Sequence, residues 1–156
     1  MSKSLSRVRH ALTIHAPGTE IVEVGQARTA AEAAASLGCV VGQIANSIML
    51  LGAESGQAKL FLTSGANRVD LGRAGTLAGE ALVKADAAVI RAQTGFAIGG
   101  VAPLGHLSEV AGWMDQSLFS YAQIYAAAGT PRHLFGIAPT LLAEICDLQV
   151  SDFITL

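Results

Sequence analysis

Apolar and polar positions recur along this chain in two different periods, and the period changes several times. Leu5, Val8 and Leu12 follow the spacing of one helix face, and Pro17-Gly18 ends that run. Residues 20–24 alternate between polar and apolar instead, which predicts a short strand with one polar face. The N-terminal part therefore predicts a helix followed by a strand.

The next stretch predicts an alanine-rich helix and a hairpin. Thr29 and Glu32 have the spacing of a capping box, in which each residue satisfies a backbone N–H at a helix start. Gly38 stands where a glycine commonly ends a helix. Further along, the pattern predicts a buried strand at 44–51, a turn at 52–57 and the hairpin partner at 59–63.

The second half of the chain predicts shorter elements that follow a polar connection at 64–70. They are helices at 71–78 and 80–85, a strand at 87–90, an extended segment at 107–114, a helical turn at 115–121, strands at 123–128 and 133–137, a helix at 139–147 and a strand at 150–154. Strands and helices interleave irregularly, and no repeat or linker separates them. We therefore expect one α+β domain over residues 1–156 with a mixed, curved sheet.

Composition excludes several classes of protein. Hydrophobic residues make up 51% of the 156 residues and charged residues 14%, which favours a compact domain with a large core. The most apolar run, 40–53, is interrupted by polar residues and is too short for a membrane span, and the first ten residues do not predict a signal peptide. Cys39 and Cys146 lie far apart, as reduced core cysteines do, so we expect a cytoplasmic protein.

The net charge of −2 indicates no broad nucleic-acid surface, so no DNA partner is expected and any RNA contact must be local. His10 and His15 are five residues apart, and no cluster of histidine and cysteine has the spacing of metal ligands. We therefore expect neither a metal nor another cofactor.

Residues 94–106 are the most unusual stretch of the chain. They contain four glycines and a proline and end on His106. Such a loop allows backbone N–H groups to approach a ligand closely, although it matches neither the dinucleotide fingerprint nor the phosphate-binding loop. Two interpretations remain open: a loop that holds a carbonyl, carboxylate or sugar hydroxyl, and a structural crossover.

Four polar residues outside or at the end of this loop could serve a site. Asn46 interrupts an apolar strand and needs hydrogen-bond partners, from a neighbouring loop or from a ligand. Arg68 follows a strand and could contact a phosphate or remain a solvated side chain. His106 and His133 each stand next to a tight turn, where a ligand contact and a structural hydrogen bond are both reasonable.

Three motifs together resemble one family. They are 62–70, LTSGANRVD; 94–106, TGFAIGGVAPLGH; and 126–131, AAAGTP. In this order and spacing they are similar to the YbaK/ProX family of aminoacyl-tRNA deacylases, which is homologous to the editing domain of bacterial prolyl-tRNA synthetases. The resemblance covers nearly the whole chain. It implies a single α+β domain with a barrel-like sheet surrounded by helices.

The resemblance also implies a function. The pocket would take the aminoacylated 3′-terminal adenosine of a mischarged tRNA and release the wrong amino acid by ester hydrolysis, without a metal. An aminoacyl-tRNA synthetase is a further possible partner. The backbone N–H groups of Gly99 and Gly100 would act on the ester. The residues that would bind substrate are Ser47, Asn67, Arg68, Phe96, Val101, Pro103, Gly105, His106, Gly129, Thr130 and His133.

One position departs from the family pattern. Asn46 stands where catalytically competent members usually carry a lysine, while Lys59 and Lys84 lie outside the motifs and are not expected in the pocket. Loss of one charged contact at a reacting centre costs about 2–4 kcal/mol of transition-state stabilisation, or roughly a hundred- to a thousandfold in rate. Two hypotheses follow: a deacylase acting on a proline-type tRNA that carries a small amino acid, and a non-catalytic protein that binds an aminoacyl-adenosine or an amino-acid-like ligand.

Overall fold

One long strand, β2 (Ile44–Gly52), connects the whole sheet. In the computed structural model, which describes residues 2–25 and 27–156, eight strands form a single mixed sheet in the order β1-β7-β6-β2-β3-β5-β8, with β4 pairing to β2. The other strands are β1 (Ile21–Glu23), β3 (Ala58–Ser64), β4 (Leu82–Lys84), β5 (Ala111–Asp115), β6 (Ile124–Ala127), β7 (His133–Ile137) and β8 (Gln149–Ser151). The predicted α+β class and mixed, curved sheet are confirmed, but the sheet stays open between its edges β1 and β8 instead of closing into a barrel.

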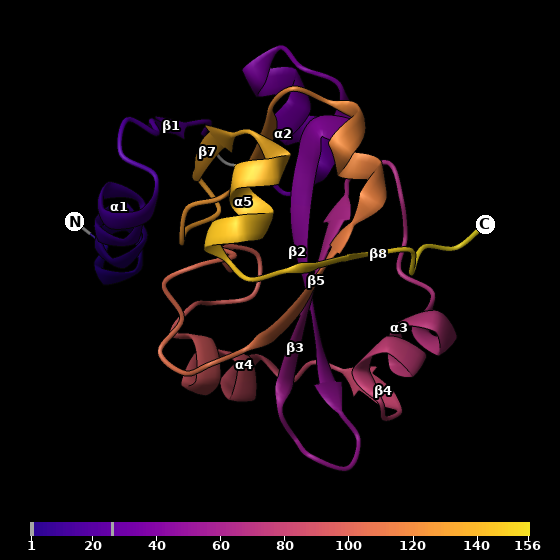
Figure 1. The fold of residues 1–156 in the computed structure, drawn as a ribbon. Helices are drawn as coiled ribbons and strands as arrows, with labels where there is room; N and C mark the ends of the chain where they lie inside the picture. Colours follow the sequence, from indigo (N-terminus) through magenta and orange to yellow (C-terminus); the bar gives the residue numbers. More distant parts are fainter. Residues whose placement is uncertain (1, 26) are drawn as a thin grey trace.

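Helices surround this sheet (Figure 1). They are α1 (Lys3–His15), α2 (Ala30–Leu37), α3 (Leu71–Ala78), α4 (Ala87–Thr94) and α5 (Pro139–Ile145), with 3₁₀ turns η1 (Val41–Gln43) and η2 (Gln116–Ser120). In Figure 1, α1 lies at one side of the molecule near β1, and α3 and α4 lie near the end with the β2–β3 turn. No helix among the described residues is both long and apolar enough to cross a lipid bilayer.

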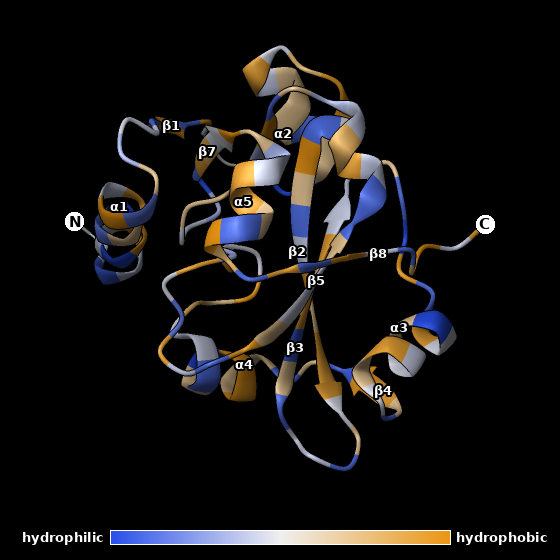
Figure 2. Ribbon diagram, viewed as in Figure 1, coloured by the Kyte–Doolittle hydropathy of each residue, from blue (hydrophilic) through white to orange (hydrophobic). Residues whose placement is uncertain are grey.

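Helix ends follow the signals in the sequence. The Ser2 hydroxyl accepts a hydrogen bond from the Leu5 N–H and starts α1, whose apolar stripe is visible in Figure 2. The Thr29 hydroxyl accepts from the Glu32 N–H and starts α2, as the capping box predicted. Gly38, with a φ of +70°, ends α2 in the left-handed conformation that glycine adopts without strain.

Every residue of β3 is buried, so this strand runs through the core. The Phe61 ring stacks on Trp113 with 4.9 Å between the centroids, and it meets the edge of Phe153 at 5.1 Å. Strand β3 is therefore a fixed support for its neighbour β2.

Two predicted elements were wrong. Residues 80–85 were expected to be helical, but they contain the three-residue strand β4, which pairs with the end of β2. Residues 87–90 were expected to form a strand but begin α4, because the Asp86 carboxylate caps the N–H groups of Ala88 and Val89. Gly95, with a φ of +83°, ends that helix.

The pairing of β2 leaves a gap on one of its edges. On that edge, Ile44 and Ala45 pair with β6, and Leu50 to Gly52 pair with β4. Within the described residues, Asn46 to Met49 have no strand partner there. Since the backbone of this stretch stays open to other groups, it is the natural place for a ligand site.

The turn between β6 and β7 packs closely against α1. A Cβ on Gly129 would lie 2.7 Å from the Ser4 carbonyl oxygen, whereas one on Gly99 would meet nothing within 4 Å. Both glycines have the same φ of +98°, so alanine would cause similar backbone strain at each.

We therefore predict that Gly129→Ala lowers the free energy of unfolding by about 1–3 kcal/mol more than Gly99→Ala does, because only the former overpacks the contact with α1. Urea titrations of the two variants and the unmodified protein measure the difference. Equal losses would contradict a close contact between this turn and α1.

Candidate functional site

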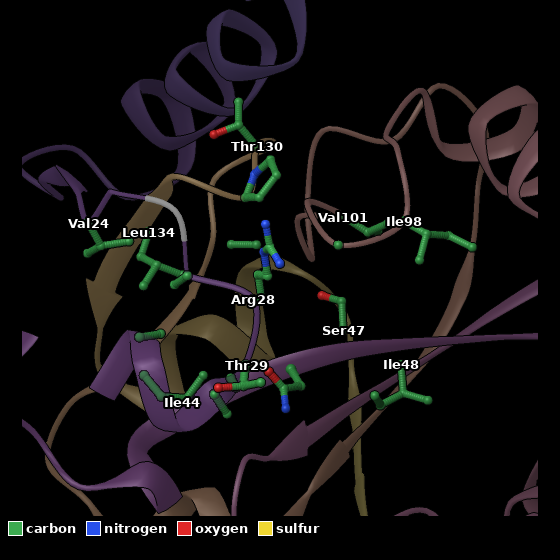
Figure 3. A pocket seen from close by; sticks show the side chains of 18 residues that line it. Val24, Arg28, Thr29, Ile44, Ser47, Ile48, Ile98, Val101, Thr130 and Leu134 are labelled. Carbon is green, nitrogen blue, oxygen red and sulfur yellow. The ribbon is translucent and has the colours of Figure 1, made fainter. Parts of the chain in front are cut away.

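A cavity of about 350 Å³ opens beside the unpaired edge of β2. Figure 3 shows the Arg28 side chain in the middle of this cavity, between Thr29 and Thr130. In this view Ser47 and Val101 lie to the right of Arg28. The walls come from the start of α2, from β2, from the turn before β7 and from the glycine-rich loop 95–106. This first cavity thus collects four segments that are distant in sequence.

Two smaller cavities adjoin the first. The second cavity, of about 230 Å³, lies toward β4 and shares Ser47 and Ile48 with the first. The third, of about 280 Å³, lies toward α3 and shares Asn46 and Ile48 with the first. We call this third cavity the Arg68 groove; it is lined by Asn46, Ile48, Leu50, Thr63, Asn67, Arg68, Val69 and Leu71. The stretch Asn46–Ile48 is therefore the ridge at which the three cavities meet.

Positive charge is concentrated around this ridge. The first cavity contains Arg28, the second Lys84 and the third Arg68, and no aspartate or glutamate occurs among the described residues that line them. Lys84 does not line the first cavity, but β4 pairs with β2 and brings Lys84 opposite Leu50, where it lines the adjoining second cavity. The whole chain has a net charge of −2, so the positive character is local.

Several polar groups at the ridge and the loop can serve a ligand. The Ser47 hydroxyl oxygen is buried and has no hydrogen-bond partner in the described part of the chain. The N–H groups of Gly99 and Val101 likewise have no acceptor among the described residues. The Gly100 N–H donates to the Ala97 carbonyl at 3.0 Å, so it closes the turn and does not fill the donor role predicted for it.

Arg7 of α1 fixes both ends of the glycine-rich loop. Its guanidinium donates to the Gly95 carbonyl at 2.8 Å and to the Gly105 carbonyl at 3.2 Å. The same group lies 4.6 Å from the centroid of the fully buried Phe96 ring. On the far side, Gly100 packs against Thr130, where a Cβ would come within 2.9 Å of the backbone. The loop is thus held before any ligand arrives.

His106 supports the loop from the same side. Its Nε2 lies 2.6 Å from the Ala102 carbonyl, and its ring meets Phe96 edge to face at 5.8 Å. Burial lowers the pKa of His106 below its ordinary value, and the nearby Arg7 charge lowers it further, although the bond to Ala102 acts in the opposite direction. The neutral ring therefore donates through Nε2 at pH 7.

The structure gathers some of the predicted site residues and separates others. Those that line the first cavity are Asn46, Ser47, Gly99, Val101 and Thr130, and those in the Arg68 groove are Asn67 and Arg68. Phe96 and Pro103 are buried in the loop, while Gly105 and His106 line a separate groove beside α1. Gly129 packs on α1, and the Nδ1 of His133 lies 2.6 Å from the Thr130 hydroxyl, so both shape the turn that carries Thr130.

Sequence reasoning missed Arg28, Thr29, Lys84 and Ile98 as lining residues. Arg28 and Thr29 could have been found from the capping box, since the start of a helix next to a conspicuous loop favours anions. For Lys84 the signal was absent, because its position depends on a pairing that the sequence pattern did not predict. No group of three or more potential metal ligands is found among the described residues.

We predict that Arg7→Met lowers the free energy of unfolding by about 2 kcal/mol, because two hydrogen bonds from a charged donor are lost. Amide exchange in residues 95–105 should also become faster. Arg9→Met, an exposed change on the same helix, is the matched control and should do neither. Unaltered exchange in the loop of the Arg7 variant would contradict the role of Arg7 as its clamp.

The lowered pKa of His106 predicts that the stability of the protein depends on pH. Between the lowered pKa of the folded state and the ordinary value of 6.5, the unfolded chain binds more protons. The free energy of unfolding should therefore fall as the pH drops below about 6.5. His106→Gln keeps a donor for Ala102 but cannot titrate, so it should flatten this slope in urea titrations between about pH 5.5 and 7.5. If the free energy of unfolding of the His106→Gln variant depends on pH as steeply as that of the unmodified protein, the lowered pKa of His106 is contradicted.

Comparison with known proteins agrees with this geometry. A solved structure from a study of epitope grafting onto scaffold proteins has a TM-score of 0.93 and 42% identity, covering 100% of both chains. A second structure, described as a candidate trans-editing enzyme for prolyl-tRNA synthetase, has a TM-score of 0.92 and 43% identity, covering 100% of this chain and 99% of its own. A hypothetical protein, APE2540, has a TM-score of 0.86 and 25% identity, with 96% and 99% covered. Residues 24–145 match the family model of the aminoacyl-tRNA editing domain, and the chain therefore belongs to that family, as its resemblance predicted.

Proposed function

We propose that this protein is a trans-editing deacylase that hydrolyses the ester of a mischarged tRNA. The family supports an editing function, and the similar structure described as a trans-editing enzyme for prolyl-tRNA synthetase favours a proline-type tRNA. A small amino acid is the proposed acyl group, and the cytoplasm, where tRNAs are charged, is the proposed location. Because the net charge of the chain is −2, delivery of the tRNA by a synthetase is part of the proposal.

The observation that carries the proposal is the distribution of charge around the ridge Asn46–Ile48. Three cavities with one cation each and no lining acid meet there, in a chain whose net charge is negative. Such a site suits a ligand with several phosphates near one end. The 3′ end of a tRNA has this character, with the ester at the tip and phosphodiesters behind it.

The chemistry proposed is attack of water on the ester carbon. The free N–H groups of Gly99 and Val101 and the Ser47 hydroxyl are the donors available to polarise the carbonyl oxygen. No aspartate, glutamate, histidine or lysine is among the described residues that line the first cavity. A ribose hydroxyl of the substrate is therefore the proposed group that orients the water. The bond from the carbonyl carbon to the ribose oxygen breaks, that oxygen takes up a proton, and the free amino acid leaves.

A second candidate function is binding of the aminoacyl end without hydrolysis. Asn46 favours it, because an amide at the ridge carries no charge to stabilise the developing oxyanion. Asn46 lines both the first cavity and the Arg68 groove, so its side chain is available to a bound ligand.

The test is loss of the ester from proline-type tRNA charged with alanine, cysteine or serine. We predict slow hydrolysis above the buffer rate, and a rise in kcat/KM of at least about tenfold for Asn46→Lys, which adds a charge next to the ester. Asn46→Gln, which keeps the amide, is the control and should not accelerate the reaction.

Hydrolysis no faster than in buffer, for the protein and for the Asn46→Lys variant alike, would refute the deacylase. Tight binding of an amide-linked aminoacyl-adenosine without turnover of the ester would then establish the binding function instead.

A further inference from the structure

The Arg68 groove lies on the α3 side of β2, and of its lining residues the ester chemistry involves only Asn46. It has a volume of about 280 Å³ and joins the first cavity through Asn46 and Ile48. A ligand whose reacting end sits in the first cavity therefore has this groove next to it, on the other side of the two shared residues.

The lining of the groove combines an apolar wall with polar groups. Ile48, Val69 and Leu71 supply the wall, and 55% of Leu71 is exposed even though it is a large apolar side chain. Arg68 and Asn67 supply the polar groups. An apolar surface next to a guanidinium suits a nucleotide, because a base can lie on the former while its phosphate binds the latter.

The backbone that carries Arg68 is fixed from the C-terminal end of the chain. The Arg68 carbonyl accepts from the Thr155 N–H at 2.8 Å, Val69 bridges to Ile154, and the Asp70 N–H donates to the Phe153 carbonyl at 2.8 Å. A ligand that binds Arg68 would therefore order only its side chain, which lowers the entropic cost of binding.

The side chains of the polar pair differ in what they already bind. The Asn67 amide donates to the buried Asp115 carboxylate at 2.9 Å, which fixes its orientation. Arg68 is exposed, and it takes part in neither of the salt bridges found among the described residues. Arg68 is thus the cation that this groove offers to a ligand.

We propose that the Arg68 groove binds the nucleotide that precedes the terminal, aminoacylated adenosine, with its phosphodiester on Arg68 and its base against Ile48 and Leu71. This inference rests on the proposed function and adds the direction in which the RNA leaves the site. The alternative direction leads past Lys84 in the second cavity, which is smaller. A planar guanidinium binds a phosphate through two parallel hydrogen bonds and can stack on a base, which an ammonium group cannot do.

The experiment compares two ester substrates that differ only beyond the terminal nucleoside. One is alanyl-adenosine, and the other is the alanylated trinucleotide C-C-A. We expect Arg68→Gln to lower kcat/KM about 5- to 50-fold for the trinucleotide, mainly through KM, and to leave alanyl-adenosine unchanged. Arg68→Lys should recover part of the loss. For binding of the trinucleotide, the slope of the logarithm of the binding constant against the logarithm of the salt concentration should also decrease in magnitude by about one.

Two variants serve as controls. Arg91→Gln removes an exposed cation of α4 and should behave like the unmodified protein with both substrates. Lys84→Gln tests the other direction. If Lys84→Gln discriminates between the two substrates and Arg68→Gln does not, the RNA leaves through the second cavity and the proposal is overturned. Equal effects of Arg68→Gln on both substrates, or none on either, overturn it as well.

Failure of the proposed function can be separated from failure of this inference. If neither ester is hydrolysed by the protein, binding of the unacylated C-C-A trinucleotide and of adenosine is compared by titration. A preference for the trinucleotide that Arg68→Gln abolishes supports the groove even without catalysis. A preference that survives the substitution, or no preference at all, refutes it.

Discussion

The site depends on one interruption of backbone pairing. Strand β2 pairs with β3 from Ala45 to Leu51 on one edge, but on the other edge β6 and β4 cover only its two ends. Because β6 has four residues and β4 has three, neither reaches the stretch Asn46–Met49. The open stretch lies under the glycine-rich loop, which Arg7 holds at both ends. A strand supported by its buried neighbour β3 thus forms the floor of the site.

The same arrangement explains how an acidic chain presents positive cavities. Several of its carboxylates serve structural roles: Asp70, Asp86 and Asp115 cap the starts of helices, and Glu80 and Asp152 pair with Lys59 and Arg73. Arg28, Arg68 and Lys84 have no such partner among the described residues. Since surface charges are screened within about 10 Å, a ligand at the ridge responds to these three cations more than to the net charge.

Much of the fold could be predicted from local signals. Short stretches of sequence predict α1 from its apolar spacing, α2 from its capping box, and the hairpin of β2 and β3. The error at 80–90 has a physical cause: an apolar run of four residues fits a strand and a buried helix face equally well. Asp86 and Gly95, which cap the two ends of α4, were the signals that decide between the two.

The site was harder to predict, because its members meet only through tertiary pairing. Asn46 was found because it interrupts an apolar strand, and Arg68 because it belongs to a recognisable motif. Arg28 and Lys84 are placed by a helix start and by a three-residue strand, so their convergence requires the register of the sheet. Likewise, the choice between Gly99 and Gly100 as a donor depends on one turn hydrogen bond that glycine spacing does not reveal.

The position of the charges has a consequence for the chemistry. The ridge where the cavities meet carries Asn46, which is neutral, and each cation belongs to a single cavity instead of to the ridge that they share. Electrostatic attraction to phosphates decreases slowly with distance, whereas stabilisation of an oxyanion needs a donor at hydrogen-bond distance. Under the proposed function, charges placed in this way would strengthen binding of the substrate and of the transition state to a similar extent, so they would lower KM without raising kcat. Under the proposed function, Arg28 and Arg68 therefore hold the RNA, whereas the uncharged donors at the ridge and the loop accelerate hydrolysis.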